Sequence, residues 1–436
     1  MSYSPYAAYK DSGVAWLGAV PAHWKIDKVK HLACLSGEKV DGFGSTANYV
    51  GLEHVQSGTG QFVGSFEGMQ TEAESTVNTF ETGDVLFGKL RPYLAKAVVA
   101  ETDGICSSEF LVLRPEAVDP NYLKFCLLFE GFIKTVDAST FGSKMPRADW
   151  TFISQLRLPK PPTSEQQAIA DYLDTETAHI DALIREKDGL IRLLGEFRQS
   201  VIADLTTGAN LAVAKTETGN IFCPAIPSSW QMVRIGKYAR IGNGSTPLKD
   251  NPDYWSGGTF PWLNSAVVNK DEVLEGSELV TDEALRFCHL PVVQAGAVLV
   301  ALTGQGKTRG QVTVLRIKAT INQHLAYLAA DPNAFDTDYL FWTLTGMYAA
   351  LRMVSEGQGG TKGALTCEDL SRFQIPMPSL EEQQAIAVQV KTETARINDL
   401  IEHAKAEITL LKELRAATIA DAVLGRIDVR PTHPCQ

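Results

Sequence analysis

With 436 residues, 44% of them hydrophobic and 21% charged, the chain is long enough for two or three globular domains. It contains no run of 18 apolar residues, and its opening "MSYSPYAAYKDSGVAW" lacks the basic and apolar regions of a leader, so we expect neither a membrane span nor secretion. Seven scattered cysteines without a C-x-x-C pair argue against a zinc site and predict free thiols in a reducing cytoplasm. The net charge of −11 disfavours tight nucleic-acid binding unless a local basic surface or a basic partner offsets it.

The first segment, residues 1–158, predicts a mixed, β-rich domain. Short β-branched and aromatic runs, such as "GDVLFGKL", "AKAVVAE" and "SSEFLVLRP", are separated by Gly, Asn and Asp. The β-rich part of this segment, from about residue 20, opens with "VPAHWKIDKVKHLACLSG" and ends with "LRLPKPP". We therefore place a first domain boundary at residue 158.

A long helix follows over residues 159–208, and it recurs, followed by a C-terminal tail, over residues 376–436. The stretch 165–208 aligns without a gap to 382–425, and about half of the aligned positions are identical, including "EQQAIA" and "TETA". Ser164 and Glu381 are candidate first-turn caps, no proline interrupts either stretch, and Gly208 and Gly425 stand where helices end. At 1.5 Å per residue each helix would be about 60 Å long.

Apolar residues recur at alternating spacings of four and three in both helices, which predicts a coiled coil. The predicted interface residues are Ile169, Leu173, Glu176, Ile180, Leu183, Lys187, Leu190, Leu194, Phe197 and Val201, then Ile386, Val390, Glu393, Ile397, Leu400, Ala404, Glu407, Leu411, Leu414 and Thr418. We expect the two helices to pair with each other, with their polar members fixing the register. The alternative is a helical hairpin packed into an ordinary core.

The second segment, residues 209–375, repeats the organisation of the first. It begins with "IPSSWQMVRIGKYARIGNG", ends with "FQIPMPS", and contains runs such as "GAVLVALTG", "QVTVLRI" and "HLAYLAA". The order domain–helix–domain–helix predicts an α+β molecule with pseudo-twofold symmetry. If the helices run antiparallel, the two domains lie at opposite ends of a rod.

Within this segment "GQGKT", residues 304–308, resembles a nucleotide-binding loop. The first glycine of that consensus is replaced by Ala301, and "RGQVTVLRI" after Thr308 reads as a strand instead of a helix. We therefore predict a β-hairpin, equivalent to "VLFGKLRPYLAKAVV" in the first segment. An NTP-hydrolysing enzyme stays an alternative, and it predicts nucleotide turnover that Lys307→Ala would abolish.

The two hairpins differ in sequence but are both rich in basic and amide side chains, which suits contact with DNA phosphates and base edges. The predicted DNA-binding residues are Lys89, Arg91, Tyr93, Lys96, Lys144, Arg147, Gln305, Lys307, Arg309, Gln311 and Lys362. The competing interpretation is a solvated hairpin with incidental charges. No catalytic constellation, cofactor fingerprint or metal-binding pattern is evident, so we expect no active site and no metal.

Several of these stretches together resemble the DNA specificity subunit of type I restriction-modification enzymes. They are "YKDSGVAWLGAVPAHW", the two "P-x-x-x-EQQAIA" helix entries, "LRPYLAKAVVAETDGICSSEFLVLRP" and "GNGSTPLKDNPDYWSGGTFPWLNS". The resemblance covers essentially the whole chain. The acidic net charge departs from expectation, and the variable core of each domain prevents the transfer of base-contacting residues.

This resemblance implies two target-recognition domains, each reading one half of a split, asymmetric site on double-stranded DNA, with an antiparallel coiled coil setting the gap. The subunit would be non-catalytic, cytoplasmic and part of a bacterial defence system. It would recruit two methyltransferase subunits, which methylate adenine with S-adenosylmethionine, and two translocase-nuclease subunits, which use ATP and magnesium. The alternative is a coiled-coil scaffold that reads no bases.

Overall fold

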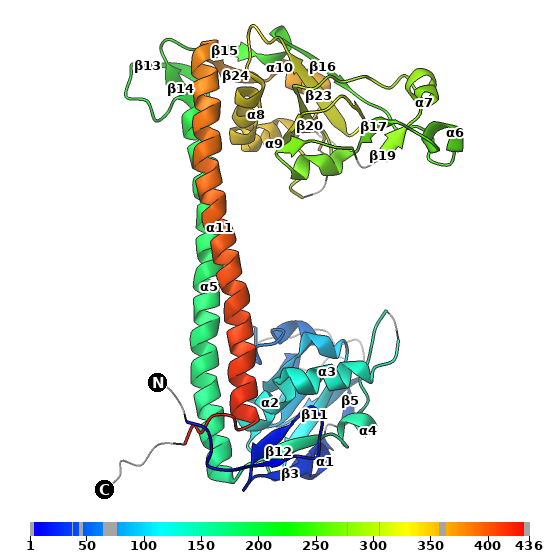
Figure 1. Cartoon of the computed structure of the whole chain (residues 1–436), viewed down its shortest axis with the longest axis vertical. Coiled ribbons are helices and arrows are strands. Elements are labelled where there is room, and N and C mark those ends of the chain that lie inside the picture. Colours follow the sequence, from blue (N-terminus) through cyan, green and yellow to red (C-terminus); the bar gives the residue numbers. More distant parts are fainter. Residues whose placement is uncertain are drawn as a thin grey trace. The chain divides into compact units, whose positions relative to one another are not determined.

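Two long helices, α5 (Thr163–Thr207) and α11 (Leu380–Val423), carry the repeated sequence, as predicted (Figure 1). The computed structural model describes residues 4–36, 38–42, 47–63, 76–142, 144–276, 278–304, 306–356 and 363–430. The chain forms two units, and each long helix contributes to both. The first unit is Met1–Gly189 with Lys405–Gln436, and the second is Leu190–Ala404.

Over its described residues, the first unit contains two four-stranded sheets. The central antiparallel sheet has the order β4 (Ala33–Ser36), β11 (Phe110–Pro115), β8 (Val85–Gly88), β9 (Ala97–Val99). The second has the order β5 (Lys39–Asp41), β7 (Thr76–Phe80), β10 (Gly104–Ser107), β6 (Tyr49–Val50). The first unit also contains two separate strand pairs, β1 (Tyr9–Asp11) with β2 (Ala19–Pro21) and β3 (Lys25–Lys28) with β12 (Arg157–Lys160). The helices are α1 (Val29–Leu32), α2 (Pro120–Leu128), α3 (Glu130–Ala138) and α4 (Trp150–Ile153).

In the described residues of the second unit, the central sheet has one strand more than its counterpart and the other sheet has one strand fewer. That sheet has the order β16 (Ala239–Asn243), β23 (Leu325–Ala330), β20 (Ala297–Ala301), β21 (Val312–Leu315), β18 (Glu272–Val273). The other strands are β19 (Glu278–Val280), β17 (Phe260–Leu263) and β22 (Thr320–Ile321), with the pairs β13 (Lys215–Asn220) and β14 (Cys223–Pro227), and β15 (Gln231–Arg234) and β24 (Gln374–Met377). The helices are α6 (Pro252–Trp255), α7 (Asp282–Phe287), α8 (Thr337–Gly346), α9 (Tyr348–Glu356) and α10 (Cys367–Arg372).

Equivalent contacts tie each domain to the start of the following long helix. The Asp119 amide donates to Gln166 Oε1 at 2.8 Å, and the Asp336 amide donates to Gln383 Oε1 at the same distance. Both glutamine side chains are almost fully buried, so each replaces water for a backbone group that would otherwise be unpaired. The predicted duplication therefore extends from the sequence to individual hydrogen bonds.

The ends of the long helices partly match the prediction. Gly208 and Gly425 have φ of +68° and +66°, and the residue after each donates its amide five residues back, to Asp204 O and Asp421 O. These are C′ glycines, as predicted. The starts differ from the prediction. Ser164 lies inside α5, which begins at Thr163, and Ser379 is the cap of α11 and not Glu381. Its hydroxyl and amide exchange hydrogen bonds with Glu382, which forms a capping box.

The two helices run antiparallel, as the ion pairs within the first unit establish. Asp181 and Lys187 of α5 pair with Arg415 and Glu407 of α11, so higher numbers on one helix meet lower numbers on the other. The coiled-coil prediction is confirmed in this respect. Among the helices within the described ranges, none combines the length and the apolar character that a membrane crossing needs.

The predicted heptad interface is correct for one row of residues, and the other row is wrong by one residue in the second half of each helix. The correct row, buried or partly buried, is Leu173, Ile180, Lys187, Leu194 and Val201, with Val390, Ile397, Ala404, Leu411 and Thr418. The second row is Thr177, Ile184, Ile191 and Arg198, with Thr394, Ile401, Ile408 and Arg415. Of the residues predicted for this row, Ile169, Glu176, Leu183, Ile386 and Glu393 are buried or partly buried, whereas Leu190, Phe197, Leu400 and Leu414 are 41%, 57%, 54% and 53% exposed. The prediction failed at these positions because it assigned apolar residues to the interface, whereas some buried positions are polar and some apolar residues are exposed.

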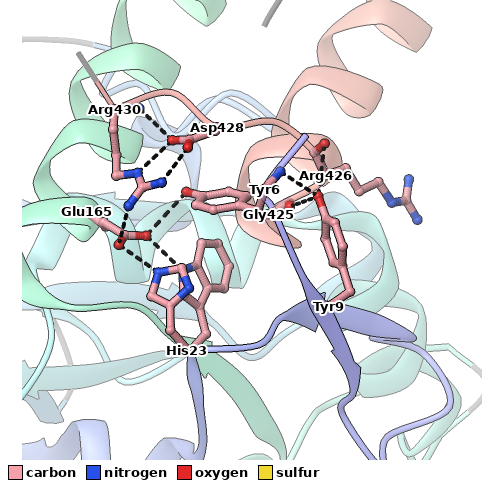
Figure 2. Close-up of polar contacts among 9 residues, drawn as sticks. Tyr6, Tyr9, His23, Glu165, Gly425, Arg426, Asp428 and Arg430 are labelled. Carbon is pink, nitrogen blue, oxygen red and sulfur yellow. Dashed lines mark hydrogen bonds and ion pairs between the residues drawn. The ribbon is translucent and has the colours of Figure 1, made fainter. Parts of the chain in front are cut away.

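In the first unit, one buried carboxylate joins segments from three parts of the chain (Figure 2). Glu165, at the start of α5, accepts hydrogen bonds from Trp24 Nε1 at 2.8 Å and from Tyr6 Oη at 3.3 Å. His23 Nε2 lies 2.8 Å from its other oxygen, and Arg430 lies at 3.5 Å. Burial holds the pKa of the Tyr6 phenol well above its ordinary value, so this hydroxyl is a permanent donor. Glu165 thereby holds the strands near residue 24 against the segment that follows α11.

Candidate nucleic-acid interface

Both predicted hairpins are present. β8 pairs with β9 and β20 pairs with β21, each antiparallel. Because Val312 begins a strand, "GQGKT" does not lead into a helix, and the geometry of a nucleotide-binding loop is missing from these described residues. The hairpin prediction is confirmed.

In the first unit, the hairpin β8–β9 lies beside residues 144–148. The Arg91 amide donates to Pro146 O at 2.8 Å, and the Ala148 amide donates to Lys89 O at 2.9 Å. The Lys89 amide donates in turn to Glu109 O at 2.9 Å. These backbone bonds bring residues distant in sequence to one edge of the central sheet. Lys89, Arg91, Lys144 and Arg147, four of the predicted DNA-binding residues, therefore lie on two adjoining loops.

The remaining first-unit candidates have different environments. Tyr93 is 52% exposed in the short turn that joins β8 to β9, so its ring is accessible. Lys96 instead turns toward its own domain, where Nζ donates to Leu52 O at 2.6 Å, and burial lowers the pKa of its ammonium group. Arg147 is exposed and forms a two-pronged ion pair with Glu109, which lowers the pKa of the Glu109 carboxyl. The prediction of DNA contact stays open for all three.

In the second unit, the candidates split between exposed and inward-facing groups. Lys307 is exposed, and its carbonyl accepts a hydrogen bond from Tyr348 Oη at 2.8 Å. Arg309 is only 8% exposed, and its guanidinium donates to Gly363 O and to Glu356 at 3.1 Å. Gln311 is half-buried. Arg309 thus serves the fold of its own hairpin, which the count of basic residues could not reveal. The predictions for Gln305 and Lys362 lie outside the described residues.

Other polar groups lie at these edges that no sequence motif indicated. Arg352 of α9 donates to Gly306 O at 2.7 Å and so stands beside Lys307. Glu109, Gln323 and His324 stand next to the same hairpins and bond to neighbouring side chains. Glu109 and His324 occupy equivalent places in the repeat, just before β11 and β23, so aligning these two strands would have drawn attention to both.

The described residues offer no alternative centre of chemistry. They contain no group of three His, Cys, Asp or Glu side chains that could hold a metal ion. All six cysteines in the described part of the chain are unpaired. Burial raises the pKa of Cys106 and Cys126 to about 12 and that of Cys223 to about 11, so these thiols are poor nucleophiles at neutral pH.

Comparison with known proteins assigns this duplicated architecture. The family model described as the type I restriction modification DNA specificity domain matches residues 56–190 and 227–410. The MjaX specificity subunit of Methanocaldococcus jannaschii, which bears the description of a putative type I restriction enzyme subunit, is 25% identical over 80% of this chain and 79% of its own length. The EcoDI specificity subunit of Escherichia coli is 23% identical over 47% of this chain and 46% of its own length.

Two solved structures share the fold. One, from work on the complex assembly and conformational transition of the type I R-M system, is 22% identical with a TM-score of 0.69, covering 93% of this chain and 98% of that chain. The HsdS subunit of Thermoanaerobacter tengcongensis is 20% identical with a TM-score of 0.53, covering 94% and 98%.

The chain has the architecture that defines this class of protein: two β-rich domains, each followed by one helix of an antiparallel pair. The chain belongs to the type I restriction-modification DNA specificity family. It is a DNA specificity subunit of a type I restriction-modification system, and this subunit is the non-catalytic one.

Proposed function

We propose that the two recognition domains, residues 1–158 and 209–375, each read one half of a bipartite, asymmetric DNA site. The helices α5 and α11 set the gap between the halves. The chain recruits two methyltransferase subunits and, in a restricting complex, two translocase-nuclease subunits. Those partners supply the binding sites for S-adenosylmethionine, ATP and magnesium.

The duplication of the domain together with its helix carries this proposal. Two domains that share the same core strand order, β4-β11-β8-β9 and β16-β23-β20-β21, and the same glutamine contact to the following helix, but with different hairpin sequences, suit two readers of different base sequences. Joining two weak half-site contacts by a stiff connection raises the affinity through effective concentration. Half-sites read from one side of the duplex lie about one helical turn, 34–36 Å, apart.

Shortening both helices tests the role of the helix pair. Residues 186–192 and 403–409 are equivalent in the repeat, and the Lys187–Glu407 ion pair joins them. Deleting both stretches removes one heptad from each helix, so the interface keeps its register. At 1.5 Å per residue the loss is about 10 Å, or about three base pairs at 3.4 Å per step. Sequencing of methylated sites should show a shorter gap between two unchanged half-sites.

The outcomes separate the proposal from its alternative. An altered half-site with an unchanged gap would refute the role of the helices in spacing. A scaffold that reads no bases predicts that deletion of the gene leaves the methylation motifs of the host unchanged. Deleting seven residues from α5 alone breaks the pairing of the two helices and is the control for nonspecific damage.

Repeated apolar residues on the outside of the helices support the recruitment of two identical partners. Leu193 and Phe197 of α5 are 54% and 57% exposed, and their repeat equivalents Leu410 and Leu414 of α11 are 63% and 53% exposed. One pair belongs to each unit. Apolar pairs at equivalent helix positions suit two copies of one partner, which we take to be the methyltransferase subunit.

Charged substitutions at one of these pairs should remove one partner. We expect the double variant L193E/F197E to bind one methyltransferase subunit instead of two, because burying a glutamate in an apolar contact costs several kcal/mol. L410E/L414E should do the same for the other copy, with stoichiometry read by native mass spectrometry. Val388→Glu is the matched control, since Val388 is 67% exposed on α11 but its repeat equivalent is Asp171. Retention of two copies by both double variants would contradict this docking site.

A further inference from the structure

The loops before β11 and β23 occupy the same place in the two domains. β11 pairs with β8 as β23 pairs with β20. The Glu109 carbonyl accepts the Lys89 amide at 2.9 Å, and the His324 carbonyl accepts the Leu302 amide at 2.8 Å. Each loop is therefore fixed against the first residue beyond the hairpin strand. The side chains of Glu109 and His324 therefore lie where the first strand of each basic hairpin ends.

In the first domain, this place holds an exposed pair of opposite charges. Arg147 reaches Glu109 with Nη2 at 2.8 Å and Nε at 3.0 Å. The two side chains are 50% and 23% exposed. An exposed ion pair contributes about 0–1 kcal/mol to folding, so stability alone does not account for the two-pronged geometry. It does hold a guanidinium and a carboxylate in fixed positions at the surface.

In the second domain, the equivalent place holds a row of polar side chains that lie within hydrogen-bonding distance of one another. Thr303 Oγ1 lies 2.8 Å from His324 Nδ1, and His324 Nε2 lies 3.3 Å from Gln323 Nε2. Thr246 Oγ1 donates to Gln323 Oε1 at 2.6 Å, which fixes the orientation of the amide. Gln323 and His324 are both exposed. Three loops thus contribute to one ordered row.

A close backbone approach builds this row. A Cβ at Gly244 would lie 1.7 Å from Ile321 O, so only glycine allows the loop of residues 243–246 to reach the loop before β23. The Ser245 amide then donates to Ile321 O at 3.1 Å. The position of Thr246 beside Gln323 follows from this contact. Such supported, oriented polar groups are what recognition of a specific ligand requires.

We propose that these two groups, Glu109 with Arg147 and Gln323 with His324, are the base-reading residues of the first and second domains. The inference rests on the proposed function and assigns its specificity to particular side chains. Arginine binds guanine O6 and N7 with two hydrogen bonds, glutamine binds adenine N6 and N7, and a carboxylate accepts from cytosine N4. The same site in the scaffold with different chemistry in each domain explains how one subunit reads two unlike half-sites.

Single substitutions in the chain assembled with its methyltransferase subunits test the assignment. In Gln323→Ala and His324→Ala, methylated-site sequencing should show the second half-site relaxed at one or two positions and the first unchanged. In Glu109→Ala and Arg147→Met the first half-site should relax instead. On duplexes carrying the cognate site, discrimination against the wrong base should fall about tenfold or more at that position.

Asn333→Ala is the matched control, because Asn333 is an exposed polar residue beyond the other end of β23. It should leave both half-sites unchanged. The assignment is overturned if the four variants keep both half-sites, or if they weaken binding to all sequences equally, which is the mark of phosphate contacts. A wild-type assembly that methylates no bipartite site at all would instead overturn the proposed function, which is a different result from failure of the residue assignment.

Discussion

Replacing Arg415 by methionine should lower the free energy of unfolding of the first unit by about 3–5 kcal/mol. Arg415 of α11 and Asp181 of α5 form an ion pair at 2.9 Å, and their side chains are 8% and 7% exposed. The same guanidinium donates to Gly58 O at 2.7 Å and to Thr59 O at 2.8 Å. Methionine keeps much of the volume but leaves a buried carboxylate without its counter-charge. Native-state hydrogen exchange in β11 should report the loss, because it measures stability locally.

Arg198→Met is the matched control, since Arg198 is the repeat equivalent of Arg415. Arg198 lies 3.6 Å from Asp271, which is 58% exposed, and its guanidinium lies 5.8 Å from the centre of the Trp342 ring. An ion pair with an exposed partner contributes about 1 kcal/mol or less, so exchange in β23 should change little. The double variant D181L/R415M should regain most of the loss, because an apolar pair can replace a buried ion pair. Equal effects of the two arginine substitutions would show that burial of the pair is unimportant.

Replacing Glu165 by alanine should cost the first unit about 3 kcal/mol, because buried donors lose a charged acceptor. Trp24 Nε1 and Tyr6 Oη both donate to this carboxylate, and both residues are almost fully buried. The segment around Tyr6 should loosen together with the one around Arg430, which also lies against Glu165. Chemical denaturation combined with hydrogen exchange of residues 4–24 measures both effects.

Glu382 provides the comparison at the equivalent position of the second helix. It is exposed, forms the capping box with Ser379, and accepts from Trp230 at a longer 3.3 Å. Glu382→Ala should therefore cost about 1 kcal/mol, the typical value for loss of a helix cap. If both alanine variants lose about the same free energy, the buried network around Glu165 adds nothing to capping.

Sequence periodicity was sufficient for the elements but not for the interface between the helices. The repeat and the glycines at 208 and 425 located both helices and their C-terminal ends, because these signals are local. The register of one interface row was wrong by one residue, since Arg415 and Thr394 lie inside while Leu414 and Leu400 lie outside. Arg415 can be buried between the helices because its guanidinium donates hydrogen bonds to a carboxylate on the other helix and to two loop carbonyls. Such partners are distant in sequence and carry no periodic signal.

The candidate interface was predictable only to the level of its loops. Alternating apolar residues around "GQGKTRG" identified the hairpin, and its basic content suggested DNA. Which cations face outward depends on contacts that no local pattern contains. Arg309 turns inward because its guanidinium donates hydrogen bonds to Glu356 and to Gly363 O, whereas Lys307 stays exposed. Exposed residues such as His324 required the strand pairing before their equivalence to Glu109 was visible.

The core of the first unit includes residues that the ribosome adds after the whole second unit. Ile419, Ala422, Val423, Leu424 and Val429 belong to the same apolar cluster as Val20, Trp24, Phe132 and Leu173. The second unit, residues 190–404, contains all of its own cluster in one continuous stretch. During translation the second unit can therefore complete its core first, although it is made later than most of the first. Until residue 429 has left the ribosome, the nascent first unit keeps apolar surface uncovered, and such surface is what chaperones bind.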